Sequence, residues 1–279
     1  PISWQLHGSF KQLNNYWQQY PSSGKIFLHD DGSFYQPDEI WKQPDLAKTL
    51  ERIQAHGKDD FYKGVTAQLI ADHMTANGGI ITLKDLEKYE AVEREPIRGN
   101  YRGYEIVSMP PPSSGGVAIV QMLNILEGFD LKEIGHNSAL YLHLLTEAMR
   151  RAYADRANFL GDSDFNEDLP ITTLTSKEHA AKQRETILMH TASESDPAKF
   201  AQLYESDETT HFSVVDKDGN MVSLTYTLEN GYGSKIVVEG AGFLLNNEMG
   251  DFNAQPGVTN ERGTIGTIAN QIRPEQRML

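Results

Sequence analysis

Apolar residues recur at helical spacing through about the first two hundred positions of the chain. Leu46, Leu50 and Ile53 lie three to four residues apart after a Pro-Asp pair, which predicts an amphipathic helix that ends near Gly57. This part of the chain is therefore predicted to be helix-rich. Further helices are predicted at residues 10–20, 61–77, 117–127 and 137–159, with shorter ones beginning at the Thr82 cap and at a capping-box pattern in 175–178.

Strand patterns occupy fewer positions. Residues 101–107 have strand character, and they lead into a loop at 110–116 whose three prolines and two glycines no regular element can cross. Residues 212–215 and 221–227 flank a Lys-Asp-Gly-Asn turn, which predicts a β-hairpin with a buried first strand. Another hairpin is expected around residues 30–32. The chain is thus predicted to be an α/β (α+β) protein whose β-rich part comes last.

The composition narrows the functions that the chain could serve. With 39% hydrophobic and 23% charged residues in 279, it has the make-up of a globular protein with one large core or two smaller ones. No window approaches the roughly 18 to 20 apolar residues of a transmembrane helix, and the first residues lack the layout of a signal peptide. A net charge of -14 disfavours nucleic acid and anionic membrane surfaces as partners. The chain has no cysteine and no His-Glu-x-x-His pair, so no disulfide, thiolate, metal or cofactor is expected.

Two adjacent threonines, Thr209 and Thr210, precede the predicted hairpin. An alcohol needs a base within hydrogen-bond reach, and cleavage of the Glu208–Thr209 bond would supply one, because the freed α-amino group has an ordinary pKa of about 7.7 to 8. The Thr209 hydroxyl could make that cut itself, by attack on the Glu208 carbonyl and an acyl shift from nitrogen to oxygen. From the residues alone, both threonines also suit the start of a strand or a cap, and a structural role is the simpler interpretation of His211.

Several stretches lie in a consistent order that covers most of the chain: 43–47, 110–116, 154–156, 161–165, 208–216, 224–227 and 244–252. Together they resemble the γ-glutamyltransferase (γ-glutamyl transpeptidase) family. The resemblance implies an N-terminal-nucleophile hydrolase, with an αββα sandwich of helices around two β-sheets that is incomplete at both ends. It also implies that residues 1–208 are the later part of a large subunit and residues 209–279 the start of a small one.

The resemblance can be carried over residue by residue. Thr209 matches the catalytic threonine that becomes the small-subunit N-terminus, and Thr227 matches the threonine beside the nucleophile's amino group. Glu248 and Asp251 match the acidic or amide pair that binds the α-amino group of the donor, and their spacing of three lets one turn aim both at one site. Glu229 stands where the family often has asparagine, and it would repel a donor carboxylate.

The implied reaction is γ-glutamyl transfer from a glutathione-type donor to water or to an amino-acid or peptide acceptor, after autoproteolysis into paired subunits. The family's carboxylate-binding arginine would precede residue 1, and its oxyanion-hole motifs would follow residue 279. The chain is therefore expected to be an internal fragment that is inactive alone. Two alternatives stay open: a related acylase or poly-γ-glutamate-processing enzyme, which Glu229 favours, and a non-catalytic fragment or pseudo-enzyme. By resemblance, the expected location is periplasmic or secreted.

Overall fold

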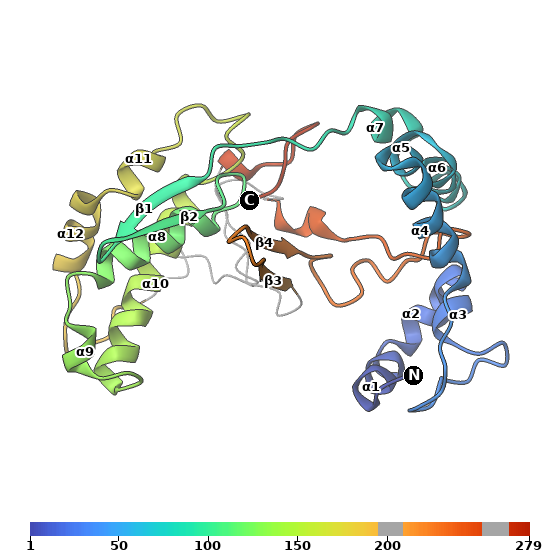
Figure 1. Cartoon of the computed structure of the whole chain (residues 1–279), viewed down its shortest axis with the longest axis horizontal. Helices are drawn as coiled ribbons and strands as arrows, with labels where there is room; N and C mark the ends of the chain where they lie inside the picture. Colours follow the sequence, from blue (N-terminus) through green and yellow to red (C-terminus); the bar gives the residue numbers. More distant parts are fainter. Residues whose placement is uncertain (195–208, 253–267) are drawn as a thin grey trace. The chain divides into compact units, whose positions relative to one another are not determined.

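The structure is a computed structural model of the chain and describes residues 1–194, 209–252 and 268–279. Helices and two antiparallel two-stranded sheets make up the described residues, so the predicted mixture of α and β structure is confirmed (Figure 1). The chain divides into two compact units, Pro1–Val92 with Ser206–Asn247 and Glu93–Glu205 with Glu248–Leu279. The predicted boundary between residues 208 and 209 separates two subunits that would arise by cleavage of the chain, and it is a different division from that into compact units. Each compact unit contains residues from both sides of this boundary.

The first unit begins with helices that are shorter than the sequence pattern predicts. The predicted helix at 10–20 is interrupted at Leu13, and the one at 61–77 is broken at Gly64, where a Cβ would lie 2.8 Å from the Asp60 Cα. Thr82 caps the last helix as predicted, and the structure adds a reciprocal capping box with Asp85. The helices are α1 (Trp4–Gln12), α2 (Asn14–Gln19), α3 (Pro21–Phe27), α4 (Pro44–His56), α5 (Lys58–Lys63), α6 (Val65–Ala76) and α7 (Leu83–Lys88).

An apolar core joins the N-terminal helices of this unit to the segment that follows its hairpin. Phe10, Trp17 and Phe27 are buried together with Val237 from that segment. The rings of Trp17 and Phe27 stack with their centroids 4.2 Å apart. Gly233 permits the segment to fold back, because its φ is +52° and a Cβ there would lie 2.4 Å from the carbonyl oxygen of Leu245.

The predicted hairpin of the β-rich part forms in the first unit. Strands β3 (Thr210–Val215) and β4 (Met221–Tyr226) pair in antiparallel register across the predicted turn. All residues of both strands are exposed, so the prediction that the first strand is buried was wrong. In the described part of the chain β3 and β4 pair only with each other, and a hairpin without a covering layer leaves both faces open. At residues 30–32, in place of a second hairpin, a turn is closed by a single bridge between Leu28 and Phe34.

In the second unit α8 lies against the hairpin of β1 and β2 and against helices α10 and α12 (Figure 1). The strand predicted at 101–107 is instead two strands, because Arg102 and Gly103 have φ of 52° and 87° and turn the chain. The elements are β1 (Ile97–Tyr101), β2 (Tyr104–Ser108), α8 (Gly115–Leu126), α9 (Leu131–Ile134), α10 (Ala139–Phe159), α11 (Ile171–Leu174), α12 (Lys177–Glu185), and the 3₁₀ helices η1 (Glu248–Asp251) and η2 (Ile268–Asn270).

The start of α12 differs from the sequence prediction by one residue. Ser176 is the cap, and its hydroxyl accepts the N–H of His179 at 3.1 Å, whereas the capping-box pattern began at Thr175. None of the helices in the described parts of either unit is long and apolar enough to span a membrane.

Candidate active site

The five predicted site residues lie on two stretches of chain, one in each compact unit. Thr209, Thr227 and Glu229 belong to the first unit, and Glu248 and Asp251 belong to the second.

Thr209 and Thr227 flank the open end of the β3–β4 hairpin. The register pairs Thr210 with Tyr226 and, continued by one residue, sets Thr209 opposite Thr227. Because side chains alternate along a strand, these two threonines come on the same face of the hairpin and Thr210 on the other. Thr209 is exposed, and Glu208, on the other side of the expected cleavage bond, lies outside the described residues.

His211 is tied to its own hairpin. Its Nδ1 lies 2.6 Å from the hydroxyl oxygen of Thr225, and its Nε2 lies 3.1 Å from that of Ser223. Both partners are on β4, on the face that the register assigns to His211. These cross-strand hydrogen bonds are consistent with the structural role predicted for this histidine.

Glu229 adopts a backbone conformation that is unusual for glutamate. Its φ is 72°, in the left-handed region that asparagine tolerates better, and its N–H donates to the Thr227 hydroxyl at 2.9 Å. The carboxylate accepts a hydrogen bond of 2.5 Å from the side-chain amide of Asn247. The resemblance to the family predicts that this carboxylate repels a donor carboxylate, whereas the structure turns it toward Asn247, the residue before Glu248.

Glu248 and Asp251 are the first and last residues of η1, and their carboxyl groups are hydrogen-bonded to each other. Burial raises the pKa of Asp251, although the bond from Glu248 and the positive charge of Arg156 act in the opposite direction. The main chain of Asp251 is fixed by the buried Asn270, whose amide donates to the Asp251 carbonyl oxygen at 2.7 Å. A spacing of three residues therefore does bring both carboxyl groups onto one turn.

Two residues outside the predicted set belong to the same surroundings. Ser114 is at the N-cap position of α8, yet its side chain makes no capping hydrogen bond. The hydroxyl instead accepts the Nε–H of Arg156, from α10, at 2.6 Å. The charge of Arg156 in turn favours the ionised form of Asp251.

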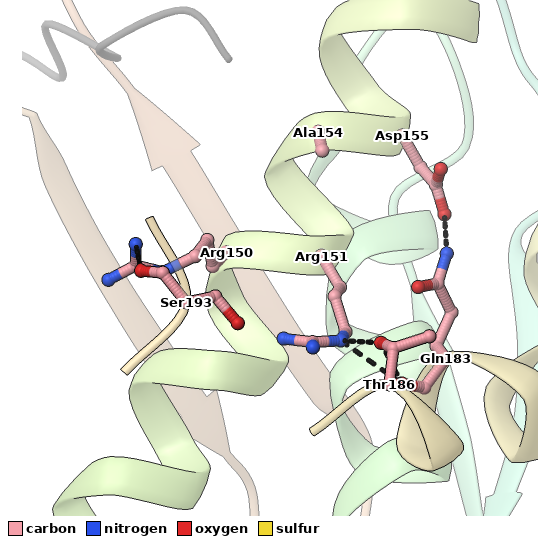
Figure 2. A pocket seen from close by; sticks show the side chains of 7 residues that line it. All are labelled: Arg150, Arg151, Ala154, Asp155, Gln183, Thr186 and Ser193. Carbon is pink, nitrogen blue, oxygen red and sulfur yellow. Dashed lines mark hydrogen bonds between the residues drawn. The ribbon is translucent and has the colours of Figure 1, made fainter. Parts of the chain in front are cut away.

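A hollow of about 290 Å³ opens on a different part of the second unit, between α10, α12 and the segment after α12 (Figure 2). None of the five predicted site residues lines it. Arg151 donates through Nε to the Thr186 hydroxyl at 2.8 Å, and Asp155 accepts from His179 at 2.7 Å, so its polar walls are largely engaged with each other. The lining residues are Arg150, Arg151, Ala154, Asp155, Gln183, Thr186 and Ser193.

Across residues 1–194, 209–252 and 268–279, no group of three or more histidine, aspartate or glutamate side chains is arranged to hold a metal ion. The five predicted site residues offer hydroxyl and carboxyl groups for acid–base chemistry. A family model described as gamma-glutamyltranspeptidase matches residues 1–279.

The chain belongs to the gamma-glutamyltranspeptidase family.

Individual relatives agree with this membership. The glutathione hydrolase proenzyme of Escherichia coli (strain K12) is 49% identical over 260 residues, which make up 92% of this chain and 44% of that protein. The Acylase ACY 1 proenzyme of Pseudomonas sp. (strain SE83) is 42% identical over 226 residues, or 81% of this chain and 40% of that protein. The chain therefore spans less than half the length of these curated relatives.

Solved structures of this family and of an acylase are also similar. The gamma-glutamyltranspeptidase of Helicobacter pylori matches with a TM-score of 0.66 and 42% identity, over 69% of this chain and 55% of that one. The cephalosporin acylase of Bacillus halodurans matches with a TM-score of 0.81 and 25% identity, over 100% of this chain and 48% of that one. The fold is thus shared by gamma-glutamyltranspeptidases and an acylase.

Sequence reasoning missed Ser114 and Arg156 in this gamma-glutamyltranspeptidase family chain. The Ser-Ser-Gly-Gly run at 113–116 belongs to the predicted loop at 110–116, and Arg156 appears only within the stretch 154–156 that resembles the family. A signal was present, because a serine directly before an apolar helix is expected to cap it. The unused capping position is visible only in the structure.

Proposed function

We propose that the full-length protein is a γ-glutamyl-transferring enzyme of the glutathione hydrolase type, with Thr209 as its nucleophile after the Glu208–Thr209 bond is cut. Family membership and the glutathione hydrolase relatives support the reaction class. The observation that carries the nucleophile assignment is the hairpin register, in which Thr209 comes opposite Thr227. The similarity to the acylase structure supports an αββα sandwich for the complete protein.

Self-cleavage would proceed through the Thr209 hydroxyl. The hydroxyl oxygen attacks the Glu208 carbonyl carbon, the C–N bond breaks, and the nitrogen takes a proton as the acyl group moves to oxygen. Water then hydrolyses this ester, which leaves a carboxylate on Glu208 and a free α-amino group on Thr209. Processing into large and small subunits at this bond is in keeping with the proenzyme names of the relatives.

Transfer would use the same hydroxyl with the new amino group as its base. The hydroxyl oxygen attacks the γ-carbonyl of the donor, and its proton passes through the amino group to the leaving amine. Water or the amine of an amino acid or peptide then takes the acyl group and regenerates the hydroxyl. Thr227 would orient the amino group, and the hairpin register, which sets it opposite Thr209 when continued by one residue, supports this role.

Glu248 and Asp251 would bind the α-amino group of the donor. An ammonium group requires anionic or carbonyl acceptors, and these two carboxyl groups share one turn. Burial raises the pKa of Asp251, and the hydrogen bond from Glu248 opposes that rise only in part.

Replacement of the nucleophile tests this proposal. We expect full-length Thr209→Ala to remain one uncut chain by intact mass and to hydrolyse no donor. The matched control is Thr210→Ala, which removes the neighbouring hydroxyl on the opposite face and should still be cut. Thr209→Ser, which keeps a hydroxyl, should also be cut. Cleavage between residues 208 and 209 in Thr209→Ala would remove Thr209 from the nucleophile role.

A second candidate function is that of an acylase on donors without an α-amino group. The 42% identity to an acylase proenzyme and the glutamate at position 229 favour it. Comparison of γ-glutamyl and glutaryl amides as donors separates the two candidates, because only the first carries the ammonium that Glu248 and Asp251 would bind. A higher kcat/KM for the glutaryl amide would favour the acylase.

Glu229→Asn tests whether residue 229 acts on the donor. If the Glu229 carboxylate faces the donor carboxylate, its removal should lower KM for a γ-glutamyl donor about 3- to 10-fold, the range that loss of one nearby like charge produces. If its function is the contact with Asn247, KM should stay the same and only thermal stability should change. The second result would remove Glu229 from the substrate-binding set.

The chain matches less than half the length of its curated relatives, and this affects the activity expected of the chain alone. Because it spans 44% of the E. coli relative, we propose that the 279-residue chain by itself turns over no donor. Activity of the full-length protein separates an enzyme from a non-catalytic relative. We further propose a periplasmic or secreted location, which fractionation of cells that express the full-length protein would test.

A further inference from the structure

We propose that Asn270 is a positioning residue for donor recognition. It holds the η1 turn in the orientation in which Glu248 and Asp251 receive the donor's ammonium group, and it thereby favours donors that carry one. The inference rests on the proposed function, which gives this turn its role. A continuous set of hydrogen bonds within the second unit carries it, from the loop at 161–166 through η2 to η1.

The turn that bears the two carboxyl groups is too short to fix its own orientation. η1 is a 3₁₀ helix of four residues, and the hydrogen bonds of such turns have poor geometry. The backbone bond at its end, from the Phe252 N–H to the Met249 carbonyl oxygen, is 3.4 Å long, beyond the ordinary range of about 2.7 to 3.2 Å. Asp251 is the last residue of η1, so no bond inside the turn satisfies its carbonyl group.

Asn270 supplies the missing partner through an amide that is engaged at both ends. Its nitrogen donates to the Asp251 carbonyl oxygen at 2.7 Å, and its oxygen accepts the N–H of Leu279 at 2.9 Å. The residue is 2% exposed, so water hardly competes for either bond. Neither a carboxylate, which only accepts, nor an alkyl side chain could make both bonds.

Asn270 is itself held by the loop that follows α10. The carbonyl of the neighbouring Ala269 accepts the side-chain amide of Asn166 at 3.0 Å. The carboxylate of Asp162, which is fully buried, accepts the N–H of Arg277 at 2.8 Å. The loop and η2 come from opposite sides of the expected cleavage bond, and because these contacts are non-covalent they do not depend on that bond.

Orientation matters most for a donor that carries an ammonium group. Carboxylates bind an ammonium through short, directional hydrogen bonds, and a misplacement of about 1 Å can cost about 100-fold in rate. A shift of the Asp251 carbonyl also moves the carboxyl group of the same residue. Loss of the Asn270 amide should therefore weaken the ammonium contact and leave the reaction of Thr209 with the donor amide intact.

Two buried asparagines allow a matched test in the full-length protein. Asn270→Ala removes the amide that holds Asp251. Asn124→Ala is the control, because it removes another buried amide of the second unit, which donates to the Thr175 carbonyl oxygen at 2.8 Å and ties α8 to the end of α11. The measurements are self-cleavage by intact mass, and kcat and KM for a γ-glutamyl amide and for a glutaryl amide, which lacks the ammonium.

We expect Asn270→Ala to be cut between residues 208 and 209 and to lower kcat/KM for the γ-glutamyl amide about 10- to 100-fold, mainly through KM. For the glutaryl amide kcat/KM should change less than about threefold. Asn124→Ala should lower the melting temperature by a similar amount but keep the wild-type ratio of kcat/KM for the two donors. Asn166→Ala, which weakens the support of Asn270 one step away, should show the same selective loss at about 2- to 5-fold.

A wild-type ratio of kcat/KM for the two donors in Asn270→Ala would overturn the inference, because the amide would then only stabilise the unit. If Asn270→Ala stays uncut or does not fold, Asn166→Ala decides, and an unchanged ratio in that variant counts against the proposal. A wild-type protein that turns over no γ-glutamyl donor would instead refute the proposed function, and this inference with it.

Discussion

The two β-hairpins in the described part of the chain have similar strands but different surroundings. In β1–β2 half-buried and exposed residues alternate along β1, and Gly99 lies directly against the buried Val120 of α8. In β3–β4 every residue is exposed, although one face carries Phe212, Val214 and Leu224. An apolar pattern along a strand thus predicts the strand but does not decide its burial, which depends on whether another layer covers it.

The turns of the two hairpins are also held in different ways. At the β1–β2 turn the N–H of Arg102 donates to Glu127, which follows α8, at 2.7 Å. At the β3–β4 turn Asp216 accepts the N–H groups of Asp218 and Asn220, both at 2.9 Å. The covered hairpin therefore depends on tertiary contacts, and the bare one, at whose open end Thr209 lies, depends on its own turn.

The largest effect is expected where the layer that covers β1–β2 is itself held together. Glu147 is buried on α10, which packs on α8, and it accepts hydrogen bonds from Arg151 and from the N–H and hydroxyl of Ser193. Glu147→Ala leaves the Arg151 charge without its anion and should lower the free energy of unfolding by about 3–5 kcal/mol. Urea denaturation measures this loss.

The matched control for that variant lies on the covered hairpin itself. Glu105→Ala breaks the exposed ion pair with Arg98 and should cost less than about 1 kcal/mol. Hydrogen exchange in Glu147→Ala should speed up for the amides of β1–β2 and stay unchanged for those of β3–β4. Equal urea midpoints for Glu147→Ala and Glu105→Ala would mean that Glu147 does not hold the covering layer together. Equal changes in hydrogen exchange in both hairpins would mean that β1–β2 depends on that layer no more than β3–β4 does.

A smaller effect is expected from direct overpacking of the covered hairpin. A Cβ at Gly99 would lie 2.8 and 2.9 Å from the methyl carbons of Val120. Gly99→Val should therefore destabilise the protein by about 1–3 kcal/mol, although valine favours strands. Ser213→Val, which puts the same side chain on the bare hairpin, should change stability by less than about 0.5 kcal/mol. Thermal melts of the two variants compare them, and similar losses would mean that β3–β4 is covered in solution.

The helices show how far the sequence alone could predict this fold. Helix α4 begins at Pro44 and stops before Gly57 as predicted, because proline at the first turn and glycine after the last act locally. The break at Gly64 was missed, since it depends on a close approach to Asp60 that a pattern of apolar residues does not record. The exposure of β3–β4 was missed for the related reason that burial is a property of neighbours.

In the candidate site, too, local features could be predicted from the sequence and contacts between distant residues could not. The nearness of Glu248 and Asp251 followed from their spacing, and the hairpin that carries Thr209 followed from its turn residues. The bond between Ser114 and Arg156 joins residues 42 apart in the chain, and no local pattern predicts such a contact. The turn of Glu229 toward Asn247 likewise depends on a backbone conformation that the sequence does not specify.

The smallest effect is expected from acid on the bare hairpin. Hydrogen bonds from the side chain and N–H of Asn220 hold the pKa of Asp216 below its ordinary value of 3.8. Because the folded pKa is the lower one, the ionised Asp216 stabilises the turn above pH 3.8, and this contribution is lost as pH falls through the folded value. Local opening of β3–β4, followed by hydrogen exchange corrected for intrinsic rates, should increase below that pH.

The β1–β2 hairpin should also loosen in acid, because Lys177 and the N–H of Arg102 lower the pKa of Glu127. Asp216→Asn separates the two responses, since it removes the titrating group of one turn and leaves Glu127 unchanged. In this variant the opening of β3–β4 should no longer depend on pH in the acidic range, and β1–β2 should respond as in the wild type. An unchanged acid response of β3–β4 would mean that this hairpin, like the covered one, is held by contacts beyond its own turn.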